Sequence, residues 1–153
     1  MNRYLTLDLD NKKDATFFAE KLFADRDEWR RKRRKKEAEL NSIRTLSAVS
    51  NSEVHSGNIA NPTEQKAIDV LRLEDDIHRY ENYEYVMEYG LSHIEPDERE
   101  VIEAFYFKPK GKMTNVMVDE LANKWNCSPR FVYKKKRIAI LNFVDAVRVI
   151  INY

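Results

Sequence analysis

The sequence predicts an all-α protein, with long helices in the N-terminal half and a separate helical domain at the C-terminal end. The 153 residues include only three glycines and four prolines, while 35% of the residues are charged and 42% are apolar. Few turn-forming residues and many charged ones are typical of long, solvated helices, and an all-β sandwich would need more turns. The length allows one compact domain with an extension but not two full domains.

The segment 1–41 is predicted to contain one long helix over residues 14–41, with Asp14 as its N-cap. Phe18, Leu22 and Trp29 recur on one helical face, and the segment has no Gly or Pro. Residues 30–36 are all Arg or Lys and would surround an isolated helix, so we expect them to project into solvent or onto phosphates. Within this run Arg33 and Arg34 are candidate DNA-binding residues, and a plain solvated face is the alternative.

Residues 42–61 are predicted to be a linker, because they are rich in Ser and Asn and lack periodicity. An acidic helix is predicted over residues 62–90, with Asn61 as N-cap and Pro62 at its first position. Its apolar residues follow a heptad seam formed by Val70, Leu73, Ile77, Tyr80, Met87, Leu91 and Ile94, with Glu84 at the one missing position. The seam either packs within the chain against the face of Phe18 and Trp29 or forms a homodimeric coiled coil.

Three further helices are predicted in the segment 91–153. The first follows a break at Glu95 and Pro96, and the second ends at Asn126, a residue type that tolerates left-handed backbone geometry. Ser128 is the expected N-cap of the third, with Pro129 at its first position. Its core face is expected to contain Val132, Ala139 and Phe143. The second and third of these helices are separated by the three-residue turn Asn126-Cys127-Ser128. This is the spacing of a helix-turn-helix, a motif whose second helix enters the major groove of DNA.

Charge is strongly segregated along the chain. The net charge is +1 overall but −8 over residues 61–108 and +6 over residues 109–153. A basic end attracts polyanions, and guanidinium groups can bind guanine O6 and N7 while lysines neutralise phosphates. The residues expected to contact DNA lie on or beside the outward face of the last helix, namely Arg130, Tyr133, Lys134, Lys135 and Arg137. A helical hairpin with a solvated basic face is the alternative.

Three segments resemble region 4 of sigma-70-type factors: LSHIEPDEREVI at 91–102, ELA at 120–122 and NCSPRFVY at 126–133. With the N-terminal helix and the linker, the whole chain resembles the ArpU-type phage transcriptional regulators of Gram-positive hosts. The resemblance implies binding of double-stranded DNA and control of late or lysis-related genes, with host RNA polymerase as a candidate partner. One residue departs from the pattern, because Lys136 stands where region 4 commonly has an apolar residue.

Other classes of function have little support in the sequence. We expect no enzyme activity, cofactor or metal site, because no nucleophile with a base, Gly-rich phosphate loop or metal-ligand spacing is present. No apolar run is long enough for a membrane span and no signal peptide is evident, so we expect a location in the bacterial host cytoplasm. The alternative functions are a small terminase-like DNA-packaging adaptor and a protein that docks on RNA polymerase without touching DNA.

The C-terminal end carries more apolar surface than a helix-turn-helix of this size can cover. The residues that supply it are Ile138, Ile140, Leu141, Phe143, Val144, Val147, Val149, Ile150 and Ile151. A patch of this kind either packs on the acidic helix or forms a symmetric contact between two copies. We expect a homodimer, because paired helices would let two half-sites act together.

Overall fold

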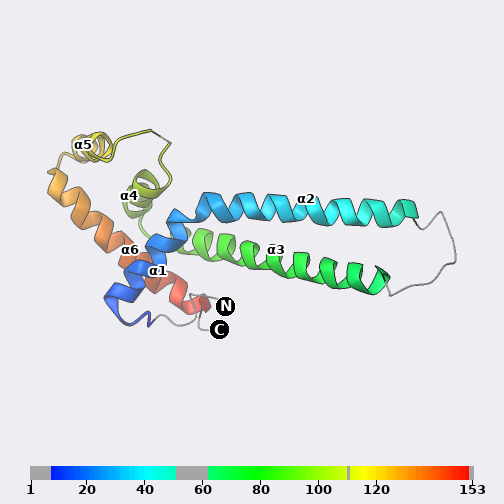
Figure 1. Cartoon of the computed structure of the whole chain (residues 1–153). Helices are drawn as coiled ribbons and strands as arrows, with labels where there is room; N and C mark the ends of the chain where they lie inside the picture. The colour runs from blue at the N-terminus through cyan, green and yellow to red at the C-terminus, as the bar shows by residue number, and fades with distance from the viewer. Residues whose placement is uncertain (1–7, 51–61, 110, 152–153) are drawn as a thin grey trace. The chain divides into compact units, whose positions relative to one another are not determined.

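A computed structural model describes residues 8–50, 62–109 and 111–151, which fold into six α-helices (Figure 1). In chain order they are α1 (Lys12–Ala24), α2 (Arg26–Ser50), α3 (Pro62–Ser92), α4 (Pro96–Tyr106), α5 (Thr114–Lys124) and α6 (Pro129–Ile151). The all-α prediction is confirmed. Within these ranges no helix has both the length and the apolarity needed to cross a bilayer. The chain divides into two units, one of residues 26–84 and one of the residues before and after them.

The N-terminal helix is shorter than predicted and begins earlier. Asn11, not Asp14, is the N-cap, and its side chain accepts a hydrogen bond from Lys13 N at 2.9 Å. The helix ends at Ala24, and the carboxylate of its C-cap residue, Asp25, pairs with Lys21 at 2.7 Å. The prediction of one helix over residues 14–41 is therefore wrong: α2 begins anew at Arg26 and belongs to the other unit.

The predicted linker over residues 42–61 is helical in its first part. α2 continues through Ser50, and Thr45 Oγ1 donates to Asn41 O at 2.8 Å inside it. Residues 51–61, including the predicted N-cap Asn61, lie outside the described residues. α3 begins at Pro62, as predicted, and ends two residues beyond the predicted limit.

In the unit of residues 26–84, the heptad seam packs against α2. Leu73 and Ile77 of α3 form a buried cluster with Leu40 of α2, flanked by Ile43 and Val70. At the other end of the pair, Trp29 is 4% exposed and its ring lies edge-on to Tyr83, 6.1 Å between centroids. The partner of this part of the seam is thus α2 of the same chain, whereas Phe18 belongs to the other unit.

The basic run of α2 is split between two faces. Arg30 forms a two-pronged ion pair with Glu84, the residue that interrupts the apolar seam. Arg33 Nη2 lies 3.3 Å from Glu81, and Lys36 Nζ lies 3.3 Å from Asp76. The expectation that the whole run projects into solvent or onto phosphates is therefore wrong. Arg30, Arg33 and Lys36 recur every three residues and so share one face of α2. The acidic helix α3 can pack against this face because it supplies carboxylates rather than apolar groups.

In the other unit, α6 is the central helix and contacts α1, α4 and α5 (Figure 1). Phe143 of α6 is fully buried, and its ring centroid lies 4.7 Å from that of Phe23 of α1. Phe23 also contacts the ring of Tyr106 at 5.2 Å. The last turns of α3 join this core at Gly90, where a Cβ atom would lie 2.3 Å from Phe143 Cε2.

The apolar C-terminal residues that suggested a homodimer are mostly covered within the chain. Ile140, Val144 and Val147 are at most 1% exposed, and α1 is among the helices packed on α6. Ile138 and Val149 remain 41% and 58% exposed. Because α1 packs on α6, most of this apolar surface does not need a second copy to cover it, and the homodimer stays a prediction.

A buried carboxylate ties α4 to α6. Glu98 is 4% exposed, accepts a hydrogen bond from Asn142 Nδ2 at 2.6 Å and accepts another from Glu95 N at 3.2 Å. The second bond is part of a capping box at the start of α4, where Pro96 occupies the first turn. Both carboxyl oxygens of Glu98 are thus hydrogen-bonded, as a buried polar group requires. The bond from Asn142 ties α4 to α6, while the bond from Glu95 N holds the first turn of α4.

Candidate nucleic-acid interface

A four-residue turn, Trp125–Ser128, joins α5 to α6. Asn126 has a φ of 51°, which confirms the predicted left-handed geometry. Its N–H donates to Asn123 O at 3.2 Å, while Cys127 N donates to Ala122 O at 2.9 Å. This pair of bonds is a Schellman motif, which ends a helix firmly. The turn therefore sets a defined angle between α5 and α6.

The start of α6 agrees with the prediction. Phe131 N lies 3.3 Å from Ser128 Oγ and 2.9 Å from Ser128 O, so Ser128 caps the helix. Val132 and Ala139 are both fully buried. The rotation of α6 about its axis follows from these two residues, and it leaves Arg130, Lys134 and Arg137 exposed.

The five basic residues between positions 130 and 137 fall into two groups. Lys135 and Lys136 point toward neighbouring helices: Lys135 Nζ lies 2.5 Å from Asp97 of α4, and Lys136 Nζ lies 3.5 Å from Glu20 of α1. The other three, Arg130, Lys134 and Arg137, form no ion pair with any residue that the structure describes. The ammonium group of Lys135, which is also a predicted DNA contact, thus lies at the carboxylate of Asp97.

Charge pairing on the inner side of α6 has visible electrostatic effects. The hydrogen bond from Lys135 holds the pKa of Asp97 below its ordinary value of 3.8. Lys136, the residue that departs from the region 4 pattern, lies over the rings of Phe105 and Tyr106, at 4.8 and 5.1 Å from their centroids. Its ammonium group is thus accommodated by the faces of two aromatic rings and by the carboxylate of Glu20.

The half-buried phenol of Tyr106, beside Lys136, belongs to the same network. Tyr106 Oη donates to Glu20 Oε1 at 2.6 Å. Burial, with a smaller effect of the Glu20 carboxylate, raises the pKa of Tyr106 well above its ordinary value of 10.0. Glu20 therefore receives both a phenol and an ammonium group, and it positions α1 against α4 and α6 without reducing the charge of the exposed face.

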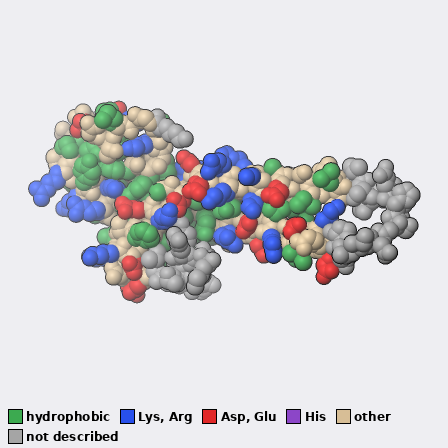
Figure 2. Space-filling model, in the orientation of Figure 1, with side chains coloured by type: hydrophobic (Ala, Val, Ile, Leu, Met, Phe, Trp, Pro, Cys, Tyr) green, Lys and Arg blue, Asp and Glu red, His purple; other side chains and the backbone are tan. Residues whose placement is uncertain are grey.

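The exposed face of α6 surrounds an open hollow of about 550 Å³. The residues that line it are Ser128, Arg130, Phe131, Lys134, Arg137 and Ile138. Phe131 and Ile138 are 47% and 41% exposed. Tyr133 is also exposed, at 43%, and its ring lies edge-on to Phe105, 5.6 Å between centroids. Figure 2 shows Lys and Arg side chains gathered at this end of α6.

Phe131 and Ile138 are not among the residues predicted to contact DNA, although Ile138 is part of the predicted apolar surface of the C-terminal end. Both are apolar residues that lie off the face marked by Val132 and Ala139, and this mismatch is the signal that could have identified them. An apolar side chain outside the core face is informative when it lies among cations, because such a surface can contact both phosphates and base edges.

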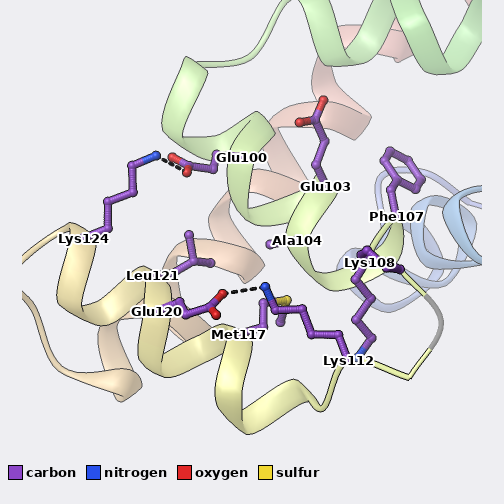
Figure 3. A pocket seen from close by; sticks show the side chains of 11 residues that line it. Glu100, Glu103, Ala104, Phe107, Lys108, Lys112, Met117, Glu120, Leu121 and Lys124 are labelled. Carbon is purple, nitrogen blue, oxygen red and sulfur yellow. Dashed lines mark hydrogen bonds and ion pairs between the residues drawn. The ribbon is translucent and has the colours of Figure 1, made fainter.

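A second hollow, about 360 Å³, lies between α4 and α5 (Figure 3). Cations at its rim are paired: Lys124 with Glu100, and Lys112 with Glu120 at 2.5 Å. Lys108 Nζ donates to Thr114 Oγ1 at 2.8 Å. The charges of this hollow are thus largely balanced, in contrast to the exposed face of α6.

The remaining predicted residues, Arg33 and Arg34, lie in the other unit. Arg33 is half-buried and pairs with Glu37 at 2.8 Å as well as with Glu81, whereas Arg34 is exposed. Arg33 is therefore held by carboxylates of its own unit, whereas the exposed side chain of Arg34 is accessible to a ligand.

No family model, characterised protein or solved structure matches this chain.

Proposed function

We propose that this chain binds double-stranded DNA through a helix-turn-helix formed by α5 and α6, and that it regulates transcription. The observation that carries the proposal is a set of three cations on one exposed face of α6, which form no ion pair within residues 8–50, 62–109 and 111–151. Arg130, Lys134 and Arg137 recur at spacings of four and three residues, which is the period of one helical face. The neighbouring Lys135 and Lys136 are paired, so the excess positive charge is directed outward.

The chemistry of this face suits the major groove. Arg130 lies in the first turn of α6, where a second helix of this type meets base edges, and a guanidinium can bind guanine bidentately. Phe131 and Ile138 offer apolar contact of the kind that a thymine methyl group makes. Lys134 and Arg137 extend the positive face along the helix and can neutralise phosphates.

The proposal of a regulator rests on the resemblance of residues 91–133 to region 4 of sigma-70-type factors and of the chain to the ArpU-type regulators. We propose control of late or lysis-related phage genes on that basis, with host RNA polymerase as the candidate protein partner. Half-site spacing in the recovered DNA would distinguish a single binding site from a paired one.

Selection of bound duplexes from a randomised pool tests the proposal, followed by fluorescence anisotropy with the selected duplex and a scrambled one. The test variant is R130Q/K134Q/R137Q, which removes three charges from the α6 face. The matched control is K12Q/K13Q/K66Q, which removes three exposed cations that form no ion pair among the described residues. Both variants have the same net charge, so a difference between them reports position rather than total charge.

We expect the α6 variant to lose preference for the selected duplex and the control to keep it. Wild-type affinity should also fall steeply between about 50 and 200 mM salt, because bound phosphates release counterions. Failure to select any sequence, or an equal effect of the two variants, would contradict the proposal. Ring-shaped oligomers in light scattering would favour a DNA-packaging adaptor instead.

A further inference from the structure

The outward face of α2 carries positive charge that the packing against α3 does not use. Of the seven consecutive basic residues, Arg30, Arg33 and Lys36 pair with acidic residues of α3. Lys32 pairs with Glu28 on its own helix at 2.6 Å. The remaining three are Arg31, Arg34 and Lys35, which are exposed and form no ion pair with the residues described in the structure. Figure 2 shows Lys and Arg side chains along the outer side of α2.

These three residues form one stripe. At 100° per residue, Arg31, Arg34 and Lys35 lie within about a third of the helix circumference, on the side opposite Trp29 and Leu40. Those two residues are 4% and 6% exposed and mark the side that faces α3. Over the stripe, α2 advances about 6 Å, which is close to the axial rise of two phosphates on one DNA strand.

The surroundings of the stripe favour a nucleic-acid backbone over a membrane. On the outward face between Asp27 and Ser42 the only apolar side chain is Ala38, so the helix has nothing to insert into a bilayer. Asp27 lies one turn before Arg31, 3.5 Å from Arg26. Glu39 lies one turn after Lys35. The acidic residues thus bound the stripe at its ends and leave its centre positive.

We propose that Arg31, Arg34 and Lys35 form a second, sequence-independent contact with the phosphate backbone of double-stranded DNA. The proposal rests on the proposed function of α6, since it assigns the same partner to the other unit. It also divides the basic run by role. The members that face α3 hold the helix pair together, whereas the outward members bind phosphates through their positive charge.

The experiment compares the full-length variant R31Q/R34Q/K35Q with R130Q/K134Q/R137Q and with the control K12Q/K13Q/K66Q. Affinity for a selected and for a scrambled duplex is measured by anisotropy over a range of salt concentrations. We expect the α2 variant to lose about 10-fold or more in affinity for both duplexes at about 0.1 M salt, and its salt slope to fall by about 2 to 3. The preference for the selected duplex should stay at the wild-type value.

A charge-retaining variant, R31K/R34K, should bind like wild type, because phosphates accept a lysine ammonium as well. Circular dichroism melting of the glutamine variant checks that the helices remain folded. An affinity and salt slope equal to those of the control variant would overturn the proposal. So would loss of binding to a polyglutamate peptide with unchanged binding to DNA, which would assign the stripe to an acidic protein.

The two proposals fail in different ways. If α6 does not read DNA, the α6 variant keeps the wild-type preference, or no preference exists to lose. If the α2 stripe does not bind phosphates, the α2 variant keeps the affinity of the control for both duplexes, whatever the α6 variant does.

Discussion

Substitution of Gly90 by alanine tests the packing of the last turns of α3 against α6. Gly90 lies near the end of α3 and is buried. A Cβ atom there would lie 2.3 Å from Phe143 Cε2, 2.6 Å from Phe143 Cδ2 and 2.6 Å from Val147 Cγ1. Favourable carbon–carbon contacts are about 3.5 to 4.0 Å long, so the added methyl group requires a shift of side chains.

Two opposing effects decide the magnitude. Overpacking of a tight core destabilises by about 1 to 3 kcal/mol. Replacement of glycine by alanine in a helix stabilises by about 1 kcal/mol, and by less near a helix end. Phe143 and Val147 are fully buried, and the Phe143 ring is also held by Phe23, so the overlap cannot be relieved outward. We therefore expect Gly90→Ala to lower the free energy of unfolding by about 1 to 2 kcal/mol.

The assay is urea denaturation followed by circular dichroism. Asn82→Ala is the matched control, because residue 82 is exposed on the same helix and the substitution changes helix propensity without adding core volume. The double variant Gly90→Ala, Phe143→Leu removes the clashing ring atoms. It should be less destabilised than the two single variants added together, with a coupling of about 1 kcal/mol.

A Gly90→Ala protein at least as stable as wild type would refute this account. Such a gain is what an exposed helical glycine would give, and it would mean that Gly90 does not face Phe143 and Val147. Additive effects in the double variant would lead to the same conclusion.

Three further predictions concern single contacts. Glu84→Ala should lower the free energy of unfolding by about 1 to 2 kcal/mol in urea denaturation, because Arg30 loses a two-pronged partner in a half-buried position. Lys135→Gln should return the pKa of Asp97 toward 3.8 in an NMR titration. Because the folded pKa is depressed, ionised Asp97 stabilises the fold above about pH 4, and wild type should lose this small contribution as the pH falls further, while Lys135→Gln should not. Asn126→Val should destabilise by about 1 to 2 kcal/mol because of the positive φ, whereas Asn126→Gly should be tolerated, and both are measured by thermal melting.

The sequence predicted those helix boundaries that a proline or a capping residue marks locally. Pro62, Pro96 and Pro129 each occupy the first position of a helix, and Asn126 has the left-handed conformation that ends the preceding one. These features depend on a few neighbouring residues, so a single sequence contains them.

Tertiary packing decided the features that the sequence did not reveal. The break at Asp25 has no Gly or Pro to mark it, and it separates Phe18 in one unit from Trp29 in the other. Charge along a single helix could not show that Glu84 and Glu81 lie opposite the basic run.

The candidate site shows the same contrast between local signals and tertiary packing. The core positions of α6 predicted which residues point outward, and Arg130, Lys134 and Arg137 are exposed as expected. Lys135 pairs with Asp97 of another helix, and periodicity within α6 could not reveal this ion pair.

The most direct test of DNA reading by α6 compares Arg130→Ala with Lys135→Ala on the selected and the scrambled duplex. We expect Arg130→Ala to weaken binding to the selected duplex by about 1 to 3 kcal/mol and to relax the preference at one base position. Lys135→Ala should leave the preference unchanged, because Lys135 faces Asp97. Equal losses on both duplexes for Arg130→Ala, or a larger loss of preference for Lys135→Ala, would contradict the assignment of the DNA-reading face.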